Sequence, residues 1–285
     1  MRKILFILFF LFFIQSVSYS AITTPPAYHT TSATEVWDQT AVLTLGGTIT
    51  VPSSTNGIMI VRLNTIALDF GGAVTVVWGA QSLTKLRGDF SSVGGGRDPG
   101  TEIWYVVAPT AATAAFLITL NGSPTATHIA HCSIDVFEGV DQSTPSDETG
   151  GEGLTQTTGT TITDSITTTT AGALIIGTIA NKATNTSGSG GVTPDTGQTE
   201  DYDADITGAT DYLSTAGGYE TIASPGAESM GWSSLVSDDS TISLMALKPA
   251  SASTAIKTIN GLAKASVKTK KGLAIASVKT INGLA

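Results

Sequence analysis

Thr127–Phe137 of this chain reads Thr-His-Ile-Ala-His-Cys-Ser-Ile-Asp-Val-Phe, and this stretch indicates the fold class. In a β-strand, successive side chains point to opposite faces of the sheet. One face would carry Ile129, His131, Ser133, Asp135 and Phe137, and the other His128, Ala130, Cys132, Ile134 and Val136. The second set is the more apolar, so we expect it to face a hydrophobic core.

The same kind of pattern continues on both sides of this stretch. Runs rich in Val, Ile, Thr and aromatic residues alternate with clusters of Gly, Pro, Asn and Ser, which favour turns. The runs are residues 41–51, 57–68, 73–78, 102–108, 114–120, 126–137, 160–169, 173–180, 212–222, 228–236 and 241–247. Helical periodicity with a capping signal does not persist for three turns anywhere. Short strands at near-regular spacing predict an all-β protein, either a jelly-roll-like β-sandwich or, as the alternative, two Ig-like sandwiches.

The N-terminus predicts export. Met1-Arg2-Lys3 is basic, residues 4–14 are apolar, and the small residues Ser18 and Ser20 precede Ala21, as in a secretory signal peptide. The apolar run is shorter than the roughly 20 residues that span a bilayer, so a retained anchor is disfavoured. We expect residues 1–20 to be a signal peptide and the mature protein to be secreted, at the cell surface or in the periplasm.

Charge divides the remaining chain at about residue 250. Residues 21–250 hold all 23 acidic residues and six basic ones, a net charge of −17, whereas residues 251–285 hold six lysines and no acid. We accordingly predict an extended leader (21–35), a β-sandwich domain (36–250) and a basic tail (251–285). Nucleic acid is not expected as a partner, because phosphate binding needs clustered Lys and Arg.

The tail repeats every eleven residues, with units beginning at Ile256, Val267 and Val278. Asn260-Gly261 in the first unit favours the tight turn of a β-hairpin. Eleven residues also equal three helical turns, but a glycine in every unit disfavours a helix. We predict short hairpins, with a helical coil as the alternative. The lysines expected to mediate assembly are Lys257, Lys264, Lys268, Lys270, Lys271 and Lys279.

Catalysis is not predicted. No nucleophile elbow, phosphate-binding glycine loop or Cys-x-x-Cys motif occurs in the sequence. Residues 133–138, Ser-Ile-Asp-Val-Phe-Glu, resemble the Glu-Ile-Asp-x-x-Glu strand of laminarinase-like family 16 glycosidases, which are also jelly rolls. In that family the two glutamates are nucleophile and acid/base, and retaining hydrolysis needs both carboxylates. Ser133 stands at the nucleophile position, so we expect neither catalytic residues nor enzymatic activity.

An acidic run within residues 181–209 is the best candidate for a binding site. Residues 181–209 are expected to form a long irregular loop, and Asp201, Asp203 and Asp205 alternate within it. Alternating carboxylates can converge on a hard cation, so we predict a Ca²⁺ site there, with a solvated acidic loop as the alternative. Tyr202 and Tyr212 could stack on a sugar ring as glycan ligands. The sole cysteine, Cys132, lies in a strand pattern and is expected to be buried and inert.

The stretch from Val36 to Pro249 resembles, loosely, secreted β-sandwich surface modules of bacteria and their phages. The segments that carry the resemblance are residues 74–79 (Val-Thr-Val-Val-Trp-Gly), 104–110 (Trp-Tyr-Val-Val-Ala-Pro-Thr), 139–145 (Gly-Val-Asp-Gln-Ser-Thr-Pro) and the terminal Asn-Gly-Leu-Ala units. The resemblance implies a fold and a surface location rather than a reaction.

Three functions are consistent with these observations. The first is an exported structural or adhesive surface protein whose tail docks on its own acidic domain, a neighbouring chain or an anionic envelope, and which could form a homo-oligomer. The second is a lectin-like, carbohydrate-binding module, assisted by Ca²⁺ if the acidic run binds it. The third is a phage virion surface or tail-fibre component, which the repeats favour and the signal peptide opposes.

Overall fold

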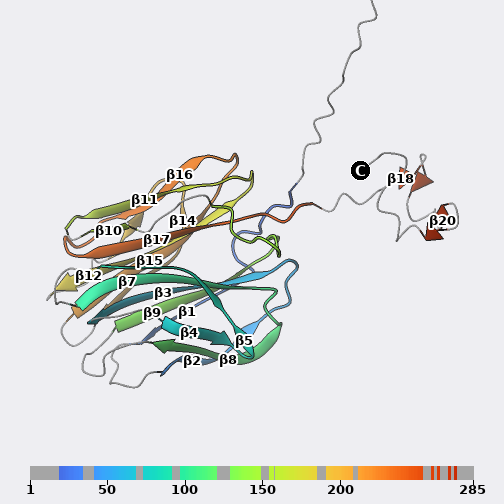
Figure 1. The fold of residues 1–285 in the computed structure, drawn as a ribbon. Helices are drawn as coiled ribbons and strands as arrows, with labels where there is room; N and C mark the ends of the chain where they lie inside the picture. The colour runs from blue at the N-terminus through green and yellow to red at the C-terminus, as the bar shows by residue number, and fades with distance from the viewer. Residues whose placement is uncertain are drawn as a thin grey trace, which may run out of the picture. The chain divides into compact units, whose positions relative to one another are not determined.

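A computed structural model describes residues 19–34, 42–68, 73–91, 97–120, 129–148, 154–156, 158–184, 191–207 and 211–252, together with four two-residue strands beyond. These ranges contain β-strands and no helix, which confirms the all-β prediction (Figure 1). Accordingly, no helix capable of crossing a membrane occurs in the described part of the chain. Tyr19–Ala250 form one compact unit, the body, and Ser251–Ala285 belong to another.

In its described residues the body contains seventeen strands. The first half holds β1 (Tyr28–Thr34), β2 (Val42–Val51), β3 (Ile58–Leu68), β4 (Ala73–Trp78), β5 (Gln81–Ser82), β6 (Thr84–Phe90), β7 (Arg97–Val107), β8 (Ala112–Leu120) and β9 (Ile129–Phe137). The second half holds β10 (Leu154–Gln156), β11 (Thr161–Thr167), β12 (Leu174–Thr184), β13 (Thr193–Pro194), β14 (Thr199–Thr207), β15 (Asp211–Thr221), β16 (Ala227–Ser233) and β17 (Ser240–Leu247). All the pairings between these strands are antiparallel.

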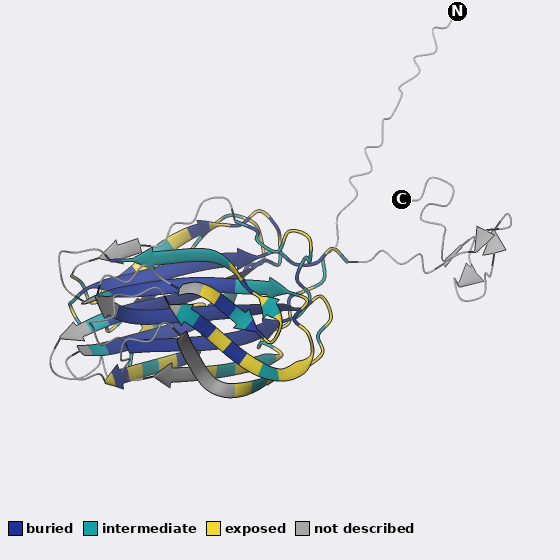
Figure 2. Cartoon of the chain, turned by 60° about the horizontal axis from the view of Figure 1, so that its bottom comes forward, coloured by how far each residue is buried: buried dark blue, intermediate teal, exposed yellow. Residues whose placement is uncertain are grey.

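The strands form four sheets that stack in layers. The first outer sheet has the order β2-β8-β4-β5, the first inner sheet β1-β9-β3-β7-β6, the second inner sheet β10-β17-β12-β15-β14 and the second outer sheet β11-β16-β13. Each half of the chain therefore forms its own sandwich, and the two inner sheets face each other (Figure 1). The central strands of the inner sheets, such as β9 and β17, are buried on both sides, as the dark blue ribbons of Figure 2 show.

Separate hydrophobic cores fill the spaces between these layers. Phe116 and Trp78 meet Val61 inside the first sandwich, and Trp232 meets Ile175 inside the second. A third core joins the inner sheets through Ile58, Ile60, Ile103, Phe137, Leu174, Ile176, Met245 and Leu247. Its continuity shows that the two sandwiches are packed against each other rather than merely tethered.

The two sandwiches share one topology. The strand order of the second inner sheet repeats that of the first, with β10, β17, β12, β15 and β14 in the places of β1, β9, β3, β7 and β6. Pairing begins at equivalent positions, Ile58 with Val107 and Leu174 with Thr221. A β-bulge interrupts β6 after Lys85 and β14 after Glu200, again at equivalent positions. This correspondence assigns to each inner-sheet position of one half a counterpart in the other half.

The structure also refines several expectations. Consecutive strands β1 to β4 alternate between the two sheets of the first sandwich, and β5 pairs with β4. The expected core face of residues 127–137 is confirmed, since Ala130, Cys132, Ile134 and Val136 all lie in the first core. The opposite face of β9 is buried as well, because the second sandwich covers it. Cys132 is fully buried, as expected.

Two other segments are more ordered than expected. The long irregular loop predicted for residues 181–209 is wrong in part, since β12 continues to Thr184 and β14 occupies Thr199–Thr207. The acidic residues of β14 hid this strand, because Asp and Glu are depleted in most strands. Residues 21–35, expected as a leader, include β1, the edge strand that pairs with β9.

The described part of the tail consists of two small hairpins. β18 (Thr258–Ile259) pairs with β19 (Leu262–Ala263), and β20 (Thr269–Lys270) pairs with β21 (Leu273–Ala274). Asn260-Gly261 stands between the first two strands in the sequence, as the hairpin prediction requires. The other tail lysines, Lys257, Lys264, Lys268, Lys271 and Lys279, lie outside the described residues.

Candidate functional site: a buried charge cluster between the sandwiches

A fully buried arginine lies where the two inner sheets meet. Arg62 stands on β3 with its side chain directed at the second sandwich, and its exposed fraction is zero. Its Nη2 atom donates to Asp135 Oδ2 on β9 at 2.6 Å and to Asp201 Oδ2 on β14 at 2.5 Å. Its Nε donates to Ser133 at 2.9 Å, and its Nη1 to the carbonyl of Gly177 at 3.2 Å. The guanidinium thus joins both sandwiches through charged and neutral acceptors.

The charges of this cluster stabilise one another against burial. Burial alone would lower the pKa of Arg62, but Asp201 and Asp135 more than offset this and raise it above its ordinary value. Burial raises the pKa of Asp201, and the neighbouring Arg62 opposes that shift. One guanidinium facing two carboxylates leaves the three groups one negative charge in excess.

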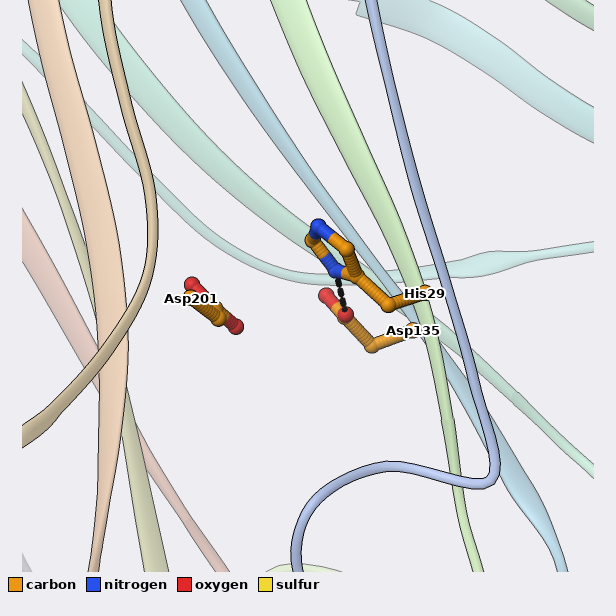
Figure 3. A group of neighbouring side chains, drawn as sticks. All are labelled: His29, Asp135 and Asp201. Atoms are coloured by element: carbon orange, nitrogen blue, oxygen red, sulfur yellow. Dashed lines mark hydrogen bonds and ion pairs between the residues drawn. The ribbon is translucent and has the colours of Figure 1, made fainter.

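His29 extends the cluster to the protein surface. It lies on the edge strand β1 opposite Asp135, with 31% of its side chain exposed. His29 Nδ1 and Asp135 Oδ1 are 2.6 Å apart, and this hydrogen bond raises the pKa of His29 despite partial burial. Figure 3 shows the imidazole and the Asp135 carboxylate joined by this bond, with the Asp201 carboxylate opposite them. Protonated His29 would supply the positive charge that balances the excess.

The bulge in β14 explains how Asp201 reaches Arg62. Glu200 pairs with Gly218 and Tyr202 with Gly217, so Asp201 is the extra residue between two paired positions. Bulges commonly redirect one side chain of a strand. Here both Asp201 and Tyr202 contact Arg62, through an ion pair and through a ring 4.8 Å from the guanidinium carbon.

A neutral network continues from the charged groups into the interface. The Tyr202 hydroxyl accepts a hydrogen bond from Asn64 at 2.9 Å and lies 2.6 Å from the hydroxyl of Thr178. The ring of His131 lies 4.8 Å from that of Tyr202. Burial, with a smaller effect from Arg62, lowers the pKa of His131 to about 4, so this histidine is neutral near pH 7.

The two aspartates of the cluster have apolar counterparts in the other half. By register, Asp135 corresponds to Met245, because each pairs with the third residue of its central strand, Ile60 or Ile176. The bulge residue Asp201 corresponds to Leu86. Met245 and Leu86 both pack in the core between the inner sheets. The shared topology therefore accepts apolar side chains at positions where the cluster has carboxylates.

The cluster has the composition of a cation-binding site. One ligating atom from each of His29, Asp135 and Asp201 lies within 4.8 Å of the others. Among the described residues, no other group of three or more His, Cys, Asp or Glu side chains has its ligating atoms this close together. Imidazole nitrogen together with carboxylate oxygen suits divalent transition metals such as Zn²⁺.

No protein-family model, curated protein or solved structure matches this chain. Its function has to be inferred from the residues themselves.

The structure separates the three aspartates predicted to bind Ca²⁺. Asp201 faces Arg62, whereas Asp203 accepts a hydrogen bond from the backbone N–H of Val192 at 3.1 Å. Asp205 accepts one from Ser214. Asp203 and Asp205 pair with Ala216 and Ser214 on the opposite face of β14, so the three carboxylates do not converge.

The two tyrosines considered as sugar ligands lie in different environments. Tyr202 is 8% exposed and its ring already contacts Arg62 and His131, which leaves no face for a sugar. Tyr212 lies near the start of β15 and is partly exposed.

The sequence offered one overlooked signal for the true cluster. Arg62 is the single charged residue in the apolar strand Ile58–Leu68, and a charge in such a strand needs a buried partner. His29 and Asp135 carried no comparable signal. Their meeting depends on β1 pairing with β9 across a separation of about a hundred residues.

Proposed function

We propose that this protein is an exported, non-enzymatic surface protein whose basic tail attaches its acidic body to a neighbouring copy of the chain or to an anionic envelope. The separation of charge carries the proposal. The body from residue 21 to 250 has a net charge of −17, and the tail adds six lysines with no acid. Opposite charges on two parts of a chain favour association between molecules and make it dependent on ionic strength.

Charge pairing within the body supports this proposal. Five of its six basic residues have described side chains, and all five lie within 4.0 Å of a carboxylate of the body. These residues are Arg62, Lys85, Arg87, Lys182 and Lys248. The acidic residues of the body outnumber its basic residues by 17, so the body should attract a basic partner. The tail lysines are the basic groups of this chain best suited to that role.

The second sandwich offers a region where acidic groups crowd. Burial, Asp203 and Asp201 raise the pKa of Glu200 to about 7. Burial and Glu228 likewise raise the pKa of Glu220 on the neighbouring strand. A lysine that approached these carboxylates would relieve their mutual repulsion, so β14–β16 are the expected docking region for the tail.

The small size of the tail hairpins also favours docking. Each described hairpin has only two residue pairs, and isolated two-stranded hairpins are marginally stable in water. A partner surface would stabilise them, either by charge or by extending an exposed sheet edge.

Light scattering and vesicle sedimentation test the proposal. We would compare the full chain, a chain that ends at Ala250, and a full-length chain with the six tail lysines changed to glutamine, at low and high salt. Assembly or binding to anionic vesicles should require the lysines and disappear at high salt. The glutamine variant is the control for tail length. If all three proteins stay monomeric and fail to bind anionic vesicles, the tail does not perform this function.

A further inference from the structure

We propose that His29, Asp135 and Asp201 bind a divalent transition metal ion of the Zn²⁺ class at the interface between the two sandwiches. This site is independent of the tail and of its proposed docking.

The ligand set comes from three strands that are distant in sequence. His29 lies on β1, Asp135 on β9 and Asp201 on β14. One imidazole nitrogen and two carboxylate oxygens make three protein ligands, and their ligating atoms lie within 4.8 Å of one another. Two ligands of one metal ion at about 2.0–2.2 Å each are at most about 4.4 Å apart, so only small movements are needed.

Arg62 binds one oxygen atom of each carboxylate and leaves the other oxygen free to face His29 or an ion. Its Nη2 takes Oδ2 of Asp135 and Oδ2 of Asp201. Oδ1 of Asp135 is bonded to His29 Nδ1, and Oδ1 of Asp201 is buried without a hydrogen-bond partner in the described part of the chain. The Asp201 side chain is only 7% exposed, so this bare oxygen is costly. A metal ion bound to this oxygen would satisfy it.

Behind the three ligands, Arg62 orients the two carboxylates, as a supporting residue does in many metal sites. Carboxylate ligands of metals are commonly hydrogen-bonded by a further residue that fixes their orientation. Arg62 has this position for both aspartates, and Ser133, 2.9 Å from its Nε, helps to hold the guanidinium. Entry of the ion displaces the proton between His29 Nδ1 and Asp135 Oδ1, and this proton leaves to solvent. The exposed third of the His29 side chain gives the ion a path.

The fold does not require carboxylates at the positions of Asp135 and Asp201. Met245 and Leu86 occupy the counterpart positions of Asp135 and Asp201 in the other half and pack in the core. Replacement of buried ion pairs by apolar side chains is often neutral or stabilising. A binding role would account for carboxylates at two positions whose counterparts in the other half are apolar.

The chemistry of the ligands selects the ion. Ca²⁺ prefers six to eight oxygen ligands, whereas Zn²⁺ accepts four ligands of mixed nitrogen and oxygen. Three protein ligands and one water would complete a Zn²⁺ site. Such an ion would tie the edge strand β1 to both sandwiches and so stabilise the N-terminal part of the body.

Thermal unfolding of the full chain, after treatment with EDTA, tests the proposal. Zn²⁺ at a hundredfold excess over its Kd should raise Tm by about 5 °C or more, and Ca²⁺ should not. His29→Gln and Asp201→Asn should abolish the shift. Asp203→Asn, on the opposite face of the same strand, should retain it and is the matched control. Co²⁺ should give a visible absorption band that is lost in the first two variants.

Two results would overturn the proposal. One is the absence of a saturable Tm shift and of a Co²⁺ band in the full chain. The other is a Zn²⁺ shift of equal size in all three variants, which would indicate binding elsewhere. Because His29 is partly exposed on an edge strand, His29→Gln should fold and keep the test decisive even if Asp201→Asn unfolds.

Discussion

Arg62 and Asp201, 139 residues apart in the chain, form a 2.5 Å ion pair across the interface between the two sandwiches. Neither side chain is more than 7% exposed. Their contact depends on the packing of the two inner sheets and on the bulge that redirects Asp201. The interface is therefore specified by a charge network as well as by the apolar core beside it.

The first prediction concerns the energy of this network. Arg62→Met leaves Asp135 and Asp201 buried without their counter-charge and should lower the free energy of unfolding by about 3–5 kcal/mol. The triple variant Arg62→Met, Asp135→Met, Asp201→Leu copies the apolar counterparts at two positions. It should be as stable as the original chain or more so. Urea unfolding without added metal measures both, and equal losses in the two variants would show that shape, rather than charge, dominates.

The second prediction concerns acid sensitivity and His131. Its pKa is about 4 in the folded chain against an ordinary 6.5, so between these values the unfolded chain binds a proton that the folded chain does not. Stability from the neutral ring is present above pH 6.5 and is lost as pH falls toward 4, by up to about 3 kcal/mol. His131→Phe should retain the ring packing and reduce this loss. Urea unfolding at pH 7 and 4.5 gives the comparison, and an unchanged pH dependence would contradict the prediction.

His29 should act in the opposite direction in metal-free protein. Its pKa is raised in the folded chain by Asp135, so its stabilising contribution is present below pH 6.5 and is lost as pH rises through the folded value. His29→Gln therefore serves as the contrasting variant in the same measurements, made in EDTA.

Sequence pattern predicted the strands better than it predicted their partners. Residues 127–137 alternate clearly, and their apolar face lies in the core as expected. The pattern could not show that the other face, with Ser133 and Asp135, is covered by a second sandwich. Burial on that side depends on packing against strands of the second sandwich, which are distant in sequence, and the local periodicity of residues 127–137 does not reveal it.

For the same reason, the sequence predicted only part of the candidate site. Asp201 was identified from the spacing of the acidic run, but on a regular strand it would share a face with Asp203 and Asp205. The bulge after Glu200 separates them. No residue type marks this bulge in the sequence, so the true neighbours of Asp201 emerged only from the tertiary structure.

The third prediction concerns the sole cysteine. Cys132 is fully buried in the first core between apolar neighbours, and burial in such surroundings disfavours the reactive thiolate. A thiol reagent should leave the folded protein unmodified and react fully in denaturant. Rapid labelling under native conditions would indicate that β9 opens without global unfolding.

The fourth prediction concerns the close approach of β15 to the charge cluster. A Cβ atom at Gly217 would lie 2.3 Å from Tyr202 Cε1 and 2.5 Å from Arg62 Nη1. Gly217→Ala must therefore displace the ring or the guanidinium and should cost about 1–3 kcal/mol, as overpacking in a well-filled core does. Gly226→Ala, whose Cβ would meet nothing within 4 Å, is the matched control and should change stability little. Urea unfolding of both variants measures the difference, and equal stabilities would mean that Tyr202 and Arg62 can shift without loss.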